Sequence, residues 1–114
     1  MSITIWHNPR CSKSRQTLAL IEARGVAPHV RLYLKDVPDI GEIAAAVDLL
    51  EIAAIELVRR GEKAYRDAQI DDASPERLVL AALAANPILI ERPIVFANGK
   101  AAIGRPPEAV LDIL

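Results

Sequence analysis

The chain has 114 residues, of which 52% are hydrophobic and 25% are charged, and its formal net charge at pH 7 is −1. This length and balance predict a single domain over residues 1–114 with one hydrophobic core. The small net charge and the aromatic content of 4% argue against a nucleic-acid partner, and no apolar run approaches the about 20 residues that span a membrane.

The first part of the chain predicts a strand, a helix and a second strand. Residues 3–6 alternate in polarity and are rich in β-branched side chains, which is typical of a strand. A turn follows, and residues 12–24 show the spacing of a helix that ends before Gly25. Residues 30–34 form the second expected strand. A unit of this kind predicts a parallel strand pair joined by a right-handed crossover.

The middle of the chain is predicted to be helical, with segments of helical spacing at residues 40–50, 52–60, 63–69 and 74–86. The last segment begins with Ser74-Pro75, an N-cap followed by the proline that is typical of a first helical position. Together these segments form a helical insertion at about residues 39–87.

The end of the chain predicts a hairpin and a helix. Two strands, at residues 94–97 and 101–104, flank Asn98-Gly99, a pair typical of a two-residue turn. A last helix is expected from Pro106 to Leu114. The full order places the chain in the α/β class, as a thioredoxin-like β-α-β…β-β-α sheet with an inserted helical block.

The single cysteine, Cys11, lies at the expected strand-to-helix turn, where unpaired N–H groups and the helix dipole favour negative charge. Half ionisation of a thiol at neutral pH requires about 2 kcal/mol of stabilisation, and the dipole typically supplies about 0.3–1 kcal/mol. Nearby groups that could supply the rest are His7, Arg10, Lys13 and Arg15. Such a cationic helix start fits a bound anion; the alternative is a solvated basic surface beside an inert, buried cysteine.

Cys11 and Ser14 form a C-x-x-S pattern, in which the serine can donate a hydrogen bond but cannot resolve a disulfide. A redox cycle at Cys11 would therefore need an external thiol. One cysteine cannot form an internal disulfide, and the first residues lack the pattern of a signal peptide. Both features favour the reducing cytoplasm.

Three arginines, Arg59, Arg92 and Arg105, are candidates for closing an anion pocket, because planar guanidinium groups suit a tetrahedral oxyanion. For two of them, a structural role that needs no anion is an alternative. Arg59 falls at a predicted helix end, where cations are stabilising, and Arg105 could form a surface pair with Glu108. Arg92 precedes Pro93, the point where thioredoxin-like folds place a cis-proline facing the cysteine. Periodicity alone does not show that the three converge.

The stretch from His7 to Arg15 resembles the active-site signature of the glutaredoxin-coupled arsenate reductase family. Further segments that match this family in order lie at residues 57–59, 87–95 and 104–108. The resemblance covers the whole chain, and four ordered segments are far more specific than any one of them.

The resemblance implies a thioredoxin-like fold with a helical insertion, and it implies roles for particular residues. The implied catalytic residues are Cys11 as nucleophile, with His7 and Ser14 beside it. The implied oxyanion-binding residues are Arg59, Arg92 and Arg105. The implied reaction is reduction of arsenate to arsenite through a Cys11 thiol adduct, with glutathione as co-substrate and glutaredoxin as partner. No bound cofactor, metal, nucleic acid or membrane is expected.

Two other functions fit the same fold. One is a glutathione-dependent thiol-disulfide oxidoreductase, in which the pocket would hold the carboxylates of glutathione. The other is a non-enzymatic regulator that binds RNA polymerase, although such proteins commonly carry a C-x-x-C switch that this chain lacks. Whether Arg10 and Lys13 join the anion site is left open by the sequence.

Overall fold

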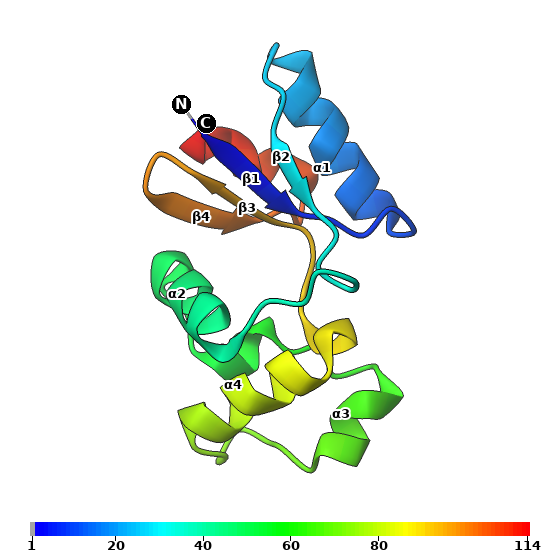
Figure 1. Ribbon diagram of the computed structural model, residues 1–114, viewed down its shortest axis with the longest axis vertical. Coiled ribbons are helices and arrows are strands. Elements are labelled where there is room, and N and C mark those ends of the chain that lie inside the picture. The colour runs from blue at the N-terminus through cyan, green and yellow to red at the C-terminus, as the bar shows by residue number, and fades with distance from the viewer. Residues whose placement is uncertain (1) are drawn as a thin grey trace. The chain divides into compact units, whose positions relative to one another are not determined.

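The computed structural model describes residues 2–114, whose contacts divide the chain into two units. One unit contains the residues up to Asp36 together with Arg92–Leu114, and the other contains Val37–Glu91. The first holds the β-sheet and the second is helical (Figure 1). The expectation of a single domain over residues 1–114 stays a prediction.

The sheet of the first unit has four strands: β1 (Ile3–Trp6), β2 (His29–Arg31), β3 (Ile94–Ala97) and β4 (Lys100–Ile103). Their order is β2-β1-β3-β4, with β1 parallel to β2 and the other two pairs antiparallel. This topology confirms the α/β class and the thioredoxin-like arrangement. The central strands β1 and β3 are mostly buried, which explains their apolar sequences.

Helix α1 (Ser12–Ala23) and the 3-10 helix η3 (Pro107–Ile113) contact each other and complete the core of this unit. Fully buried side chains from both helices and both central strands meet there, namely Ile5, Ile21, Val95 and Val110. The helix expected at the end of the chain is present, but it is a 3-10 helix and not an α-helix. Its backbone N–H groups bond three residues back, as Ala109 does to the carbonyl of Pro106.

The expected strand at 30–34 ends early, at Arg31. The carbonyl of Leu32 accepts hydrogen bonds from the N–H groups of Lys35 and Asp36, which turns the chain away from the sheet. By contrast, the expected turn at Asn98-Gly99 is confirmed. Both residues have positive φ, 55° and 72°, as a two-residue hairpin of this kind requires.

The second unit contains α2 (Ile40–Leu50), α3 (Lys63–Ala68) and α4 (Glu76–Ala85), with 3-10 turns η1 (Ala54–Leu57) and η2 (Pro87–Leu89). Helix α2 has the bounds expected from sequence, and Asp39 and Glu42 form a capping box at its start. It packs against α4. The side chains buried in this unit include Ile43, Val47, Val79, Leu83 and Leu89.

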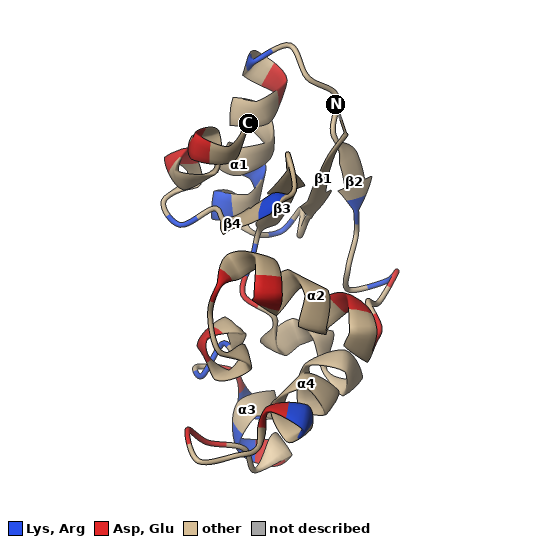
Figure 2. Ribbon diagram, turned by 90° about the vertical axis from the view of Figure 1, so that its left-hand side faces the viewer, with Lys and Arg blue, Asp and Glu red and all other residues tan. Residues whose placement is uncertain are grey.

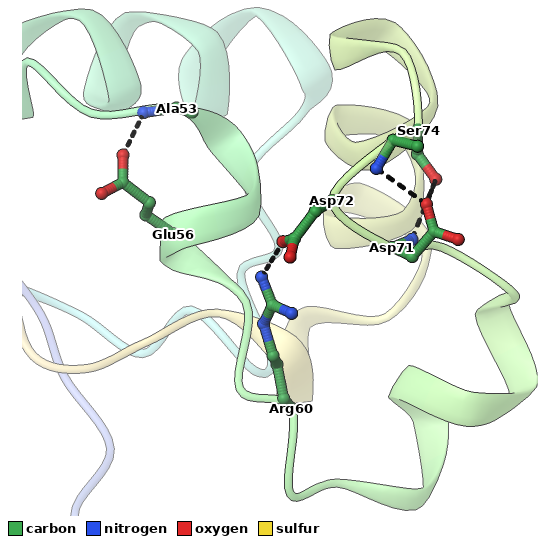
Figure 3. Close-up of polar contacts among 7 residues, drawn as sticks. Ala53, Glu56, Arg60, Asp71, Asp72 and Ser74 are labelled. Atoms are coloured by element: carbon green, nitrogen blue, oxygen red, sulfur yellow. Dashed lines mark hydrogen bonds and ion pairs between the residues drawn. The ribbon is translucent and has the colours of Figure 1, made fainter.

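Of the helix expected at residues 52–60, only the short 3-10 turn η1 is present. Val58 pairs with Ile90 in an isolated antiparallel bridge, and the N–H of Arg59 donates to the carbonyl of Leu89 at 2.8 Å. The chain is therefore extended where a helix end was expected. At the start of the 3-10 turn, the Glu56 carboxylate accepts the N–H of Ala53 at 2.7 Å (Figure 3).

The segment before α4 is fixed by polar contacts that Figure 3 shows. The guanidinium of Arg60 binds the carboxylate of Asp72, and the hydroxyl of Ser74 accepts the N–H of Asp71 at 2.9 Å. Because Ser74 is engaged in this turn, Pro75 rather than Ser74 is the N-cap of α4. Among residues 2–114, none of the helices combines the length and the apolar character that crossing a membrane would take.

Candidate active site

The turn between β1 and α1 carries Cys11, which is the N-cap residue of α1. Its backbone is extended (φ −96°, ψ 122°) and the residue is 7% exposed. The sulfur makes no hydrogen bond that caps the helix. The sulfur therefore lies at the positive end of the helix dipole and is not occupied in capping the helix.

Asn8 holds this turn together through three of its polar groups. Its carbonyl accepts the N–H of Cys11 at 3.0 Å, and its side-chain oxygen accepts the N–H of Arg10 at 3.0 Å. Its own N–H donates to the hydroxyl of Ser14 at 3.1 Å. Asn8 is buried, so these bonds are protected from water. Together they fix the position of Cys11 relative to β1.

His7 and Ser14 lie behind this turn, joined by a 2.6 Å contact between the imidazole Nδ1 and the serine hydroxyl. Both residues are buried. Burial lowers the pKa of His7 below its ordinary 6.5; the nearby Arg15 guanidinium lowers it further, and Glu22 acts in the opposite direction. Near pH 7, His7 therefore contributes a hydrogen bond to Ser14 rather than a positive charge.

The guanidinium of Arg105 contacts the sulfur of Cys11. Its Nη2 donates to the Sγ of Cys11 at 3.8 Å, and its Nε donates to the carbonyl of Arg92 at 3.0 Å. The Arg92–Pro93 peptide is cis, as expected at this point of a thioredoxin-like fold. The structure thus brings Arg105 to Cys11 directly, and it connects Arg92 to the pair through the Arg92 carbonyl.

The other cations near Cys11 differ in their surroundings. Arg10 and Lys13 are exposed to solvent, while the guanidinium of Arg15 donates to the carbonyl of Pro9 at 2.9 Å and so braces the turn. No acidic residue lies in the first turn of α1. Figure 2 shows the resulting basic character at the start of this helix. An approaching anion would meet positive charge there.

Arg59 belongs to the second unit, where two carboxylates surround its guanidinium. Its Nη1 lies 2.6 Å from Glu62, and its Nε lies 3.9 Å from Glu91. All three side chains are partly buried. Arg59 is therefore a paired cation on an extended segment, and the expectation that it ends a helix is wrong.

The chemistry available at Cys11 is that of a thiol nucleophile acting on an anion. A helix start favours the ionised sulfur, and a guanidinium in contact with that sulfur can offset charge on a bound oxyanion. Among residues 2–114, the His, Cys, Asp and Glu side chains form no group of three or more that could hold a metal ion.

Comparison with known proteins gives the family of this chain, since residues 6–113 match the model of the ArsC family. The chain belongs to the ArsC family.

Relatives within the family match along nearly the whole length. The Escherichia coli protein YfgD is 50% identical over 117 residues, covering 98% of this chain and 96% of its own. A Haemophilus influenzae protein named arsenate reductase is 41% identical over 116 residues, and the match covers both chains completely. The structure named arsenate reductase from Vibrio cholerae has a TM-score of 0.96 and 45% identity, covering 100% of this chain and 98% of that one.

The hydrogen bonds of Asn8 in the turn and the carboxylate partners of Arg59 are not foreseen from the sequence. In the sequence, Asn8 is simply part of the turn expected after residues 3–6, although an Asn-Pro pair can indicate a side chain that bonds nearby backbone. A pairing of Arg59 with Glu62, three residues apart, is expected from sequence only within a helix. The helix predicted at residues 52–60 ends before Glu62, so this prediction gives no reason to pair the two residues. The Glu91 contact has no local signal at all.

Replacing His7 with Asn should alter the pH dependence of stability. Asn keeps a hydrogen-bonding atom where Nδ1 lies but cannot take up a proton. Unfolded His7 binds a proton below about 6.5, whereas folded His7 resists it because its pKa is lowered. The wild type should therefore lose stability relative to His7→Asn as the pH falls below about 6.5, because the unfolded chain then binds a proton that the folded chain does not. Above that pH, the difference in unfolding free energy between the two proteins should stay constant. Urea unfolding, followed by the fluorescence of the single tryptophan, measures this.

His29→Asn is the matched control, because His29 is exposed on β2. Its unfolding free energy is measured over the same pH range and shows the effect of an exposed histidine-to-asparagine change. Parallel curves for wild type and His7→Asn from pH about 7.5 to about 5.5 would contradict the assignment of a buried, neutral His7.

Proposed function

We propose that this ArsC-family chain reduces arsenate to arsenite through an adduct between arsenic and the sulfur of Cys11. The observation that carries the proposal is the contact of Arg105 Nη2 with Cys11 Sγ, at 3.8 Å, at the start of α1. It joins a nucleophile to a group that binds oxyanions. Membership of the family and the names of the Haemophilus influenzae and Vibrio cholerae relatives support arsenate as the substrate.

The proposed roles follow the chemistry of each side chain. The Cys11 thiolate attacks As(V), and one arsenate oxygen leaves as water. Arg105 offsets charge on the remaining oxygens, and Arg92 and Arg59 are proposed as further oxyanion-binding residues. His7 and Ser14 hold the turn that presents the sulfur. Because Arg59 is paired with carboxylates, an oxyanion that binds it competes with them.

Two external thiols complete the proposed cycle, because the chain has no second cysteine. Glutathione forms an S–As bond with the adduct, and a second oxygen leaves as water. A glutaredoxin thiolate then attacks the glutathione sulfur, the electron pair of that S–As bond passes to arsenic, and As(V) becomes As(III). The two external thiols leave as a mixed disulfide. Water finally cleaves the remaining Cys11–As bond, which releases arsenite and restores the thiol.

This cycle requires no bound cofactor or metal, since the substrate itself accepts both electrons. It does require a supply of reduced glutathione and glutaredoxin. The proposal therefore includes a reducing compartment, the cytoplasm, as the site of action.

The purified chain should convert arsenate to arsenite when glutathione and glutaredoxin are both present, and Cys11→Ser should abolish the conversion. A hydroxyl of similar size preserves the fold but is a far weaker nucleophile than a thiolate at neutral pH. Arsenite formation is followed by chromatography with arsenic detection, and Ser12→Ala, a change at an exposed neighbour, is the control that should remain active. Turnover of a glutathionylated peptide without arsenite formation would favour the disulfide oxidoreductase instead.

Arg105→Gln should lower kcat/KM for arsenate by about 10²–10³, the range seen when an oxyanion-binding donor is removed. Glutamine keeps a polar side chain but loses the charge that compensates the arsenate oxygens. Arg24→Gln, at the exposed opposite end of α1, is the matched control and should stay within about twofold of the wild type. An Arg105→Gln enzyme with unchanged kcat/KM would remove Arg105 from the proposed site.

A further inference from the structure

The backbone between β4 and Arg105 is fixed by a tight set of contacts at Gly104. This residue is buried, and its N–H donates to the carbonyl of Pro93 at 2.9 Å. The next N–H, that of Arg105, donates to the carbonyl of Ile103 at 2.9 Å. The chain therefore leaves the sheet in one defined direction, and that direction leads to the guanidinium that contacts Cys11.

No side chain fits at Gly104. A Cβ there would lie 2.4 Å from the hydroxyl oxygen of Thr17, 3.1 Å from its methyl group and 2.8 Å from the Cγ of Pro93. Contacts below 3.0 Å require that something moves. Thr17 is fully buried, and its hydroxyl donates to the carbonyl of Lys13 at 2.8 Å, so this side chain is fixed within α1.

We infer that the contact between Gly104 and Thr17 sets the distance between the Arg105 guanidinium and the Cys11 sulfur. Thr17 and Cys11 are held on the same helix, and Gly104 and Arg105 are adjacent in the chain. The contact therefore connects the two segments that carry the reactive pair. Gly104 and Thr17 would act as positioning residues, since neither touches the sulfur in the contacts described. The inference rests on the proposed function, because it concerns the same site.

The magnitude of the displacement decides the outcome of a substitution. An alanine at residue 104 needs about 1 Å more room beside Thr17 to change a 2.4 Å approach into an ordinary contact of 3.4 Å. The Arg105–Cys11 contact is already 3.8 Å long. A shift of this size carries the guanidinium out of hydrogen-bond range of the sulfur, and interactions with a charged partner weaken sharply on that scale.

The test measures the alkylation rate of Cys11 by iodoacetamide as a function of pH, using mass spectrometry of the full-length chain. Thiolates react and thiols do not, so the rate reports the ionised fraction without any need for arsenate. Gly104→Ala should slow the reaction at pH 7 by about tenfold, the value of one hydrogen bond to a charged group. Gly41→Ala is the matched control, since its added Cβ meets only the Asp39 carboxylate at 3.4 Å.

A size exchange distinguishes positioning from general damage. Thr17→Ala alone removes the hydroxyl and methyl that support Gly104, so it should also slow alkylation several-fold. The double variant Gly104→Ala, Thr17→Ala removes the clash with Thr17 but keeps the 2.8 Å approach to the Cγ of Pro93, so its rate should recover in part and lie between the rates of Gly104→Ala and the wild type. If Gly104→Ala fails to fold, the Thr17→Ala single variant and the double variant still decide the matter.

A second comparison tests whether the effect passes through Arg105. In an Arg105→Gln background, Gly104→Ala should produce little further slowing, because the group that it displaces is already absent. Equal slowing in both backgrounds, a wild-type rate in folded Gly104→Ala, or no recovery in the double variant would each overturn the inference. Failure of arsenate turnover, with these alkylation results as expected, would overturn the proposed function alone.

Discussion

The rest of the site depends on where one sulfur atom is held. Half ionisation of an ordinary thiol at neutral pH requires about 2 kcal/mol of stabilisation, which is more than a helix dipole typically supplies. Two groups that interact favourably with negative charge lie at Cys11, namely the start of α1 and the guanidinium of Arg105. Both contributions fall off within a few ångströms. The surrounding structure must therefore hold three separate segments, the turn after β1, the start of α1 and the end of β4, in a fixed relation.

Hydrogen bonds on the buried side of the turn meet this requirement without adding charge. His7 is anchored to β2 by its backbone N–H, which donates to the carbonyl of Arg31 at 2.8 Å, and its ring contacts Ser14. Ser14 in turn accepts the N–H of Asn8, whose carbonyl holds Cys11. The chain of contacts runs from the sheet to the sulfur through neutral groups. Positive charge is thus kept on the outer side, where an anion can meet it.

Local signals account for the elements that were predicted from sequence. Residues 40–50 have helical spacing, with Asp39 and Glu42 capping the start of that helix, and Asn98-Gly99 specifies the hairpin. The position of Cys11 at a helix start followed from the turn residues before it. Errors arose where distant segments decide the conformation, as when Ile90 draws Val58 into an extended bridge. The contact of Gly104 with Thr17 has the same origin, because a glycine in sequence does not reveal what lies against it.

The two outer strands of the sheet are short, and this affects how copies of the chain behave toward one another. Strand β2 has three residues and ends where Leu32 turns the backbone, while β4 has four and ends at the packed Gly104. An exposed strand edge can recruit the edge of another molecule and extend a sheet between them. Edge strands this short present few unpaired backbone N–H and C=O groups to a second molecule. The packing of Gly104, which positions Arg105, therefore also keeps the edge of β4 short and limits edge-to-edge pairing there.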